Sequence, residues 1–563
     1  MYTLDTAAFY TDEEVALDRR LQKLRVISNK IHGREYKNNA IRKKHISKIN
    51  ELLRETKDTL KSVIDSNVGM IREVRPITLS EKNVISIFES NLTRALNMES
   101  DKVNMQMVVV RVYFFGVFQS LIENGFTIEK EKYVFFSASA GQIRTKRAVF
   151  CRQADLDKCW NTLTCGLSLD KINAMGGVNP NKYLAYLALC NSATDVWTDF
   201  NIDKTIVVDD FETLVTGTVD YIDDADYSIT RKVMEVPVPH MDGCGMILYN
   251  RTDKNFMIRA PWVKGLLASF PFDKFIREAN KREPSINHGI VTDVYGVQHD
   301  ILEEGIEIIF TKSQVKMWKY YSSWEEYKEN FKEYNCTAGI CNVERGYIPN
   351  AKFNYQMLQT LCDLSDEELE EICKSTNAKL KSIASDRDTM LDVFGATKNN
   401  SDKNAFQQCL ELYPELLQDP YCRETMRELK FKIEKEGRAG KFDIKGKYLF
   451  LVPDLYAFCE WLFLGIENPK GLLDDGEVYT RVFPNCDKLD CLRSPHLYRE
   501  HAVRWNMCGR DEEYRRWFKT NGLYTSTHDL ISKILMFDRP KCRTLWKHRD
   551  IKLGEPVIAG CGR

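Results

Sequence analysis

The sequence lacks both an export signal and a paired cysteine motif. Residues 1–5, Met-Tyr-Thr-Leu-Asp, offer no basic segment followed by an apolar run, which a secretory signal requires. The 17 cysteines are scattered, and no two of them form a Cys-x-x-Cys pair. Without export, thiols are expected to stay reduced, so the sequence predicts a cytoplasmic protein.

Long apolar runs are missing as well. The two most apolar stretches, residues 107–118 and 448–464, are interrupted by Arg111 and by Asp454 and Glu460. Because a helix needs about 20 consecutive apolar residues to cross a bilayer, no transmembrane helix and no membrane partner are expected.

Three common catalytic signatures are also absent. No Gly-x-Ser-x-Gly and no His-Glu-x-x-His occurs, so serine hydrolases of that type and zincins have no sequence support. Residues 437–441, Gly-Arg-Ala-Gly-Lys, are not a P-loop, because the two glycines are too close and Phe442 replaces the required Ser or Thr.

What the sequence does contain is ordinary globular composition with local charge clusters. Its 563 residues suffice for roughly three or four domains. Hydrophobic residues make up 43% and aromatic residues 11%, which excludes a disordered chain. The net charge of -1 conceals local clustering and therefore says little about partners.

The N-terminal region, residues 1–130, is predicted to be helical and basic. Leu17, Leu21, Leu24, Ile27 and Ile31 recur at helical spacing. Lysine and arginine are dense from residue 19 to residue 48. Two interpretations stay open: a solvated helix face, and a helical arm that contacts nucleic-acid phosphates.

Short β-rich runs follow, and they predict a first barrel or sandwich module at residues 131–350. The predicted strands are residues 133–136, 205–208, 231–238, 245–249, 256–259 and 306–310. Residues 182–189 and 263–270 are predicted to be inserted helices.

A helical connector is predicted at residues 351–440, where Ser365 and Glu368 have the spacing of a capping box. Residues 448–452 and 477–482 then predict strands of a second β-rich module at residues 441–563. The predicted fold class is therefore α+β, with two β-rich modules preceded and separated by helical regions.

Cationic residues stand at strand ends and turns of the first module. Asp242 begins the turn Asp-Gly-Cys-Gly, and Arg259 and Lys264 belong to the run Arg-Ala-Pro-Trp-Val-Lys-Gly. Lys312 and Lys316 follow the strand at residues 306–310. Lysine and arginine in such places suit triphosphate binding, although solvent-facing residues that flank strands give the same pattern.

In their order along the chain, these three motifs resemble the first double-psi β-barrel of two-barrel RNA polymerases. That family includes RNA-silencing RNA-dependent RNA polymerases and single-chain phage RNA polymerases. The resemblance implies that Lys264 and Lys316 reach nucleotide and transcript phosphates, with Lys312 as the alternative to Lys316. Arg259 and Asp242 would lie nearby on the substrate side.

Residues 445–454 and 488–497 resemble the second barrel, so the resemblance spans roughly residues 133–538. It implies that Arg493 and His496 lie near the template–product hybrid, and that the apolar run 534–537 leads to a metal-binding loop containing Asp538. In the family this loop is Asp-x-Asp-Gly-Asp, which binds Mg²⁺. Here Arg539-Pro540 follows Asp538, and Asp-x-Asp-Gly-Asp occurs nowhere in the sequence.

The resemblance implies template-directed RNA synthesis from ribonucleoside triphosphates, on an RNA or single-stranded DNA template. Two-metal chemistry needs several converging carboxylates, which Asp538 alone does not supply. The basic tail after Asp538, with little sign of a strand or helix, is then either a divergent C-terminus or the product of a shifted reading frame or split gene. In the latter case the second barrel is incomplete and the chain inactive alone.

Four other interpretations stay open. A non-catalytic nucleic-acid-binding protein would retain the barrels without metal chemistry, and a metal-dependent nuclease would use the scattered acids. Cys486, Cys491, His496 and His501 form a weak zinc pattern. The acidic run at residues 474–477 is either a cation site or an exposed β-turn.

Overall fold

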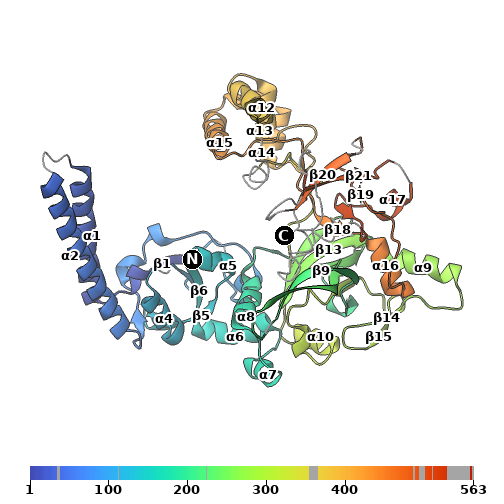
Figure 1. Cartoon of the computed structure of the whole chain (residues 1–563), viewed down its shortest axis with the longest axis horizontal. Helices are drawn as coiled ribbons and strands as arrows, with labels where there is room; N and C mark the ends of the chain where they lie inside the picture. The colour runs from blue at the N-terminus through green and yellow to red at the C-terminus, as the bar shows by residue number, and fades with distance from the viewer. Residues whose placement is uncertain are drawn as a thin grey trace. The chain divides into compact units, whose positions relative to one another are not determined.

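The chain divides into two compact units in the structure, which is a computed structural model. It describes residues 1–34, 39–99, 101–111, 113–223, 225–353, 365–485, 488–493, 501–509, 512–528 and 558–560. The first unit comprises Met1–Ile202, Ile258–Lys264 and Lys316–Cys341, and the second comprises Asp203–Met257, Gly265–Val315 and Asn342–Arg563. Both units therefore combine segments that are far apart in the sequence (Figure 1).

A six-stranded sheet with the order β1-β3-β6-β5-β4-β2 is the centre of the first unit. Its strands are β1 (Tyr2–Asp5), β2 (Arg72–Glu73), β3 (Met107–Arg111), β4 (Phe126–Ile128), β5 (Glu131–Ser137) and β6 (Arg147–Arg152). The middle strands pair antiparallel, while β1 and β2 join the two edges in parallel. Val108 and Val110, two residues apart on β3, point into one core with Phe150 of β6.

Helices cover this sheet and extend the first unit. They are α1 (Asp12–Gly33), α2 (Asn39–Ser66), α3 (Asn91–Ala95), α4 (Phe115–Asn124), α5 (Ala140–Arg144), α6 (Gln153–Thr164), α7 (Leu169–Ala174), α8 (Pro180–Leu187) and α10 (Trp324–Glu333). Leu60 of α2 and Leu121 of α4 are fully buried in the core of the sheet. Helix α8 confirms the helix predicted at residues 182–189.

The N-terminal region is less uniformly helical than its sequence predicts. Helices α1 and α2 are present, but β1, β2, β3 and β4 also lie within the first 130 residues. Strand β3 has the sequence Met-Val-Val-Val-Arg, and β-branched residues favour strands. Strand β1 pairs with β3 more than a hundred residues later in the chain, so local periodicity could not reveal it.

A seven-stranded sheet has the order β7-β17-β12-β13-β11-β16-β8. Its strands are β7 (Asp195–Val196), β8 (Thr205–Val208), β11 (Cys244–Leu248), β12 (Phe256–Ala260), β13 (Val263–Phe270), β16 (Ile308–Thr311) and β17 (Gly339–Cys341). The predicted strands at residues 205–208, 245–249, 256–259 and 306–310 are confirmed within a few residues.

The helix predicted at residues 263–270 is wrong, because this segment is strand β13. Its sequence, Val-Lys-Gly-Leu-Leu-Ala-Ser-Phe, is nearly all buried, and a short apolar run does not distinguish a strand from a buried helix. The segment is a strand because it pairs in parallel with β11, with Cys244 opposite Leu266 at one end and Leu248 opposite Phe270 at the other. Tertiary pairing here outweighs the helix propensity of leucine and alanine.

The second unit adds smaller elements around its part of this sheet. Strands β9 (Glu212–Ile222) and β10 (Ile229–Pro239) form a long antiparallel ribbon, β14 (Ile290–Thr292) pairs with β15 (Gln298–Asp300), and α9 (Phe272–Arg282) follows β13. The predicted strand at residues 231–238 lies within β10.

Four helices form a separate cluster in the connector region: α12 (Asp366–Ser382), α13 (Arg387–Phe394), α14 (Ala405–Leu412) and α15 (Pro420–Arg438). They share a small core that includes Ile383, Phe394 and Leu410. The predicted capping box is confirmed, since Ser365 and Glu368 each accept the other's backbone N–H. No described helix has the combined length and apolar content that crossing a membrane requires.

The last sheet has the order β18-β22-β19-β21-β20-β23. Its elements are β18 (Leu451–Pro453), α16 (Leu455–Leu464), β19 (Glu477–Tyr479), β20 (Lys488–Arg493), β21 (His501–Asn506), α17 (Glu512–Trp517), β22 (Leu523–Thr525) and β23 (Ile558–Gly560). The tail, for which little regular structure is predicted, thus contributes strand β23, parallel to β20. Several sheets together with helices confirm the α+β class.

Buried polar groups of the second unit connect the start of β12 to the loop before β22. The carboxylate of Glu344 accepts backbone N–H groups from Asn521 and Asn255, at 2.5 and 3.4 Å. The side-chain amide of Asn255 donates to the Thr520 hydroxyl at 2.8 Å. Burial raises the pKa of Glu344 to about 7, against the opposing effect of these hydrogen bonds.

The raised pKa of Glu344 predicts a pH-dependent stability. The folded state keeps a proton that the unfolded chain releases near pH 4.5, so the free energy of unfolding falls as the pH rises from about 4.5 to about 7. Glu344→Gln removes this titration, so we expect the difference in unfolding free energy between wild type and variant to change by about 3 kcal/mol between pH 4.5 and pH 8. Thermal unfolding of both proteins across this range measures it; parallel profiles would contradict the assignment.

Candidate functional site

A buried turn between β12 and β13 organises the candidate site of the first unit. Trp262 has φ 61, a left-handed conformation that a non-glycine residue seldom adopts. Its indole N–H donates to the carbonyl of Thr164 at 2.7 Å, and the side chain is 1% exposed. The hydroxyl of Tyr327 donates to the carbonyl of Pro261 at 2.7 Å. These contacts hold the turn rigidly in place.

Three sequence-predicted cations meet at this turn. Arg259 precedes it on β12, and Lys264 follows it on β13. The backbone N–H of Lys316 donates to the carbonyl of Trp262 at 2.8 Å, which ties Lys316 to the same turn. The positive charges of Arg259 and Lys316 both lower the pKa of Lys264, which places all three cations near one another. The structure therefore brings together Lys264 and Lys316, which the resemblance implies contact phosphates, and Arg259, which it implies lies nearby.

Burial and mutual repulsion characterise these cations. The pKa of Lys264 is lowered, first by burial and then by the charges of Arg259 and Lys316. Burial also lowers the pKa of Arg259, which is 8% exposed and whose Nε has no hydrogen-bond partner among the described residues. No described carboxylate forms an ion pair with Arg259 or Lys264.

The opposing charge near these cations is weak. If Cys341 on β17 were a thiolate, its negative charge would stabilise the protonated forms of Lys264 and Arg259. Burial raises the pKa of that thiol, so it is neutral at physiological pH and cannot balance them. Buried cations without a balancing acid are unfavourable unless an anion binds, so this arrangement is suited to a phosphate or carboxylate ligand.

In the second unit, the three quoted motifs converge on one side chain, that of Gln314. Its amide donates to the carbonyl of Leu266 at 2.9 Å, and its carbonyl accepts the backbone N–H of Thr311 at 3.1 Å. A Cβ atom placed on Gly245 or on Gly265 would lie only 2.3 or 2.4 Å from the Gln314 amide group. Both glycines are therefore required by close packing rather than by an unusual φ angle.

Asp242 and Lys312 occupy different surroundings in the second unit. Lys312 forms an ion pair with Asp209 at 2.8 Å, with the lysine 39% exposed. Asp242 is exposed. Burial raises the pKa of the neighbouring Asp210 to about 6, and the negative charge of Asp242 raises it further. The Ser313 hydroxyl donates to Asp210 at 2.6 Å and accepts the N–H of Gly243 at 2.7 Å.

The remaining predicted site residues are not described in full. Arg493 is the last residue of β20, and its side chain is not described. His496 and Asp538 lie outside the described residues, as does the predicted strand at residues 534–537. The zinc pattern also depends on undescribed residues, Cys486 and His496.

Metal-binding clusters are not found in the described part of the chain, where no three His, Cys, Asp or Glu side chains converge. The acidic run at residues 474–477 forms a turn, in which Asp474 accepts the backbone N–H of Glu477 at 3.1 Å and Gly476 has φ 82. The exposed-turn interpretation of this run is thus confirmed.

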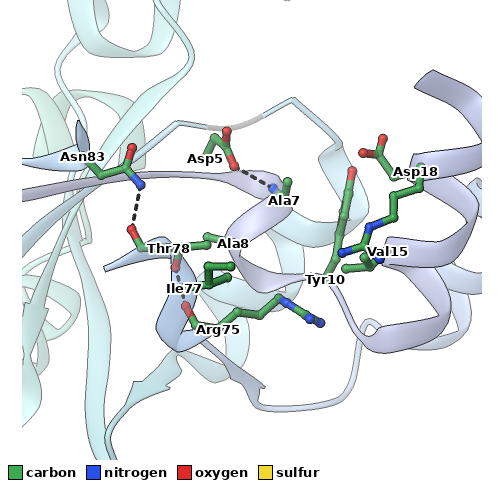
Figure 2. Close-up of a pocket in the computed structure, with 11 residues that line it drawn as sticks. Asp5, Ala7, Ala8, Tyr10, Val15, Asp18, Arg75, Ile77, Thr78 and Asn83 are labelled. Atoms are coloured by element: carbon green, nitrogen blue, oxygen red, sulfur yellow. Dashed lines mark hydrogen bonds between the residues drawn. The ribbon is translucent and has the colours of Figure 1, made fainter. Parts of the chain in front are cut away.

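A hollow of about 310 Å³ lies beside the start of α1, away from the predicted residues (Figure 2). Its lining is mixed in charge, because Asp5 and Asp18 face it together with Arg75. Asp5 is already engaged by the N–H of Ala7 at 3.0 Å. Because Arg19 also lines it, two acids and two arginines face the hollow, which therefore has no excess positive charge to favour a triphosphate.

Sequence reasoning missed two features of the site. The left-handed turn at Trp262 was hidden by the incorrect helix at residues 263–270; the pair Pro261-Trp262 between two apolar runs was its only signal. Cys341, from β17, gave no signal, because a single scattered cysteine is not informative.

Comparisons with known proteins agree with the resemblance. The model of a family described as "RNA dependent RNA polymerase" matches residues 77–503. The chain is 45% identical over 539 residues to the DNA-directed RNA polymerase YonO of Bacillus phage SPbeta. That alignment covers 96% of this chain and 62% of the relative, so the chain spans less than two thirds of the relative's length. The family description and the name of the relative differ in the template, but both name an RNA polymerase. This chain belongs to the RNA-dependent RNA polymerase family.

Proposed function

We propose that this chain takes part in template-directed RNA synthesis, in which Arg259, Lys264 and Lys316 bind the triphosphate of the incoming nucleotide and the transcript phosphates. The main supporting observation is the group of three cations beside the Trp262 turn. Arg259 is buried and Lys264 is half-buried, and neither has a described carboxylate partner. The β-rich parts around residues 203–341 and 441–528 are proposed to be the two double-psi barrels.

The proposed chemistry starts with the bound triphosphate. Lysine supplies a compact charge, and arginine can bind two phosphate oxygens at once. Because the Trp262 turn is fixed before the ligand arrives, little reorganisation accompanies binding. The cations would then stabilise the charge that develops on the leaving pyrophosphate.

Mg²⁺ is the proposed cofactor, and Asp538 its proposed ligand. The described residues hold no cluster of acids that fits a metal ion, and Asp538 is followed by Arg539 and Pro540. The described residues alone therefore do not fit a Mg²⁺ ion.

The test is primer-independent incorporation of labelled ribonucleotides on single-stranded DNA and on RNA, with Mg²⁺ present. We expect templated products from wild type and a loss of at least about tenfold for Lys264→Ala and for Asp538→Ala. Equal incorporation by all three proteins would contradict the residue roles. Triphosphate binding without templated incorporation on either template would overturn the catalytic proposal and favour a non-catalytic nucleic-acid-binding protein.

A further inference from the structure

Helices α1 and α2 form a hairpin whose base is anchored and whose far half is not. At the base, Arg72 donates to the carboxylate of Glu14 at 2.7 Å, with both side chains fully buried. Leu21 and Leu60 pack into the core of the six-stranded sheet. Beyond Leu21, α1 continues to Gly33, about 18 Å at the helical rise. Figure 1 shows the two helices side by side along this length.

The far half, here called the arm and defined as residues 19–34 and 39–48, is strongly basic. The sequence between residues 19 and 48 contains eleven lysines and arginines and one acidic residue, Glu35, in a chain whose net charge is -1. Every described cation in it is exposed: Arg19, Arg20, Lys23, Arg25, Lys30, Arg34, Arg42, Lys43, Lys44 and Lys48. Acidic residues return only at the base, for example Asp12, Glu51 and Glu55.

A merely solvated helix face does not account for this pattern. Such faces alternate charges at i,i+4 spacing, whereas the arm places Arg19 with Lys23 and Lys44 with Lys48, which are destabilising like-charge pairs. Arg42 lies in the first turn of α2, which contains no acid. A cation there opposes the helix dipole, at a cost of about 0.3–1 kcal/mol. The sequence retains these cations against local helix stability.

Several of these cations have no acidic partner in the described part of the protein. No described carboxylate pairs with Lys23, Arg25, Lys44 or Lys48. At the base, by contrast, Arg75 forms an ion pair with Asp12 at 2.8 Å. The charge of the arm is therefore available to an external polyanion.

We propose that the arm binds the phosphate backbone of duplex nucleic acid without reading its sequence. Residues 19–48 contain no tryptophan or phenylalanine and a single tyrosine, Tyr36, so they offer few of the rings on which single-stranded bases usually stack. The same absence disfavours a membrane surface, since interfacial helices usually carry such residues on an apolar face. The inference depends on the charge of the arm alone and does not require the proposed catalysis.

The test compares two matched double variants of the whole chain on the same helix. Lys44→Glu/Lys48→Glu lies in the arm, and Lys57→Glu/Lys61→Glu repeats the same charge change and spacing at the exposed base of α2. We expect the arm variant to weaken binding of a fluorescent duplex at least about tenfold near 0.1 M salt, and to make the salt slope shallower by about 2. The base variant should change affinity less than about twofold.

Two results would overturn the proposal. Equal weakening by both double variants would show that only the total charge matters. Unchanged duplex binding by the arm variant, with lost binding to phosphatidylserine vesicles, would instead assign the arm to a membrane surface. Thermal unfolding serves as the folding control, and the four substituted lysines are exposed, so both double variants are expected to fold. The experiment measures duplex binding and not RNA synthesis. A failure of this proposal can therefore be told apart from a failure of the proposed function.

Discussion

Replacing Lys264 with alanine is expected to weaken the binding of ATP by about ten- to a hundredfold. A hydrogen bond to a charged group contributes about 1.5–3 kcal/mol, and each 1.4 kcal/mol is a factor of about ten in affinity. The effect of Lys264 should be near the upper end, because the ammonium group is partly buried beside Arg259 and so is weakly screened by water. Lys316→Ala is expected to act in the same direction.

Lys319→Ala is the matched control for both variants. Lys319 lies three residues after Lys316 but is exposed, with its ammonium group 4.8 Å from the centre of the Tyr320 ring. Its removal deletes the same charge from the same segment, and we expect less than a twofold loss of ATP affinity. Fluorescence titration with ATP at fixed ionic strength measures all three variants. Equal losses for Lys264→Ala and Lys319→Ala would refute a specific site.

The lowered pKa of Lys264 adds a pH signature to the same experiment. The group loses its charge at a pH below the usual 10.5, so ATP affinity should fall as the pH rises through that lowered value. Lys264→Ala should flatten this part of the profile, whereas Lys319→Ala should leave it unchanged.

The motifs of the site could be predicted from the sequence, but their geometry could not. The order of the Asp242, Arg259–Lys264 and Lys316 motifs carried the resemblance, and the structure brings Arg259, Lys264 and Lys316 together at one turn. The conformation that joins them is a positive φ at Trp262, which only a few per cent of non-glycine residues adopt. Its stability depends on Thr164, a residue 98 positions away.

Long-range pairing explains the other differences between prediction and structure. Lys312 carried the same local signal as Lys316, yet its ion pair with Asp209 depends on a residue 103 positions away. Strand β13 has the composition of a buried helix, and its strand identity comes from pairing with β11. By contrast, the capping box at Ser365 was predictable because its two residues are local.

Gly265→Ala is expected to destabilise the second unit by about 3 kcal/mol or more. The added Cβ would lie 2.4 Å from the amide nitrogen of Gln314 and 2.5 Å from the carbonyl oxygen of Gly243. Neither neighbour can move easily, because the Gln314 amide is held by Leu266, and the Gly243 carbonyl accepts the N–H of Leu266 at 2.8 Å. Thermal and urea unfolding should show a clear loss of stability.

Gly437→Ala separates this effect from a general cost of replacing glycine. Gly437 lies within α15 of the same unit, and a Cβ there would meet no atom within 4 Å. Alanine favours a helix over glycine by up to about 1 kcal/mol, so this variant should be as stable as wild type or slightly more stable. If Gly265→Ala unfolded at the same temperature as Gly437→Ala, the close contact at Gln314 would have no energetic role. A loss confined to Gly265→Ala would instead show that the three polymerase-like motifs are held together by backbone packing that tolerates no side chain at this position.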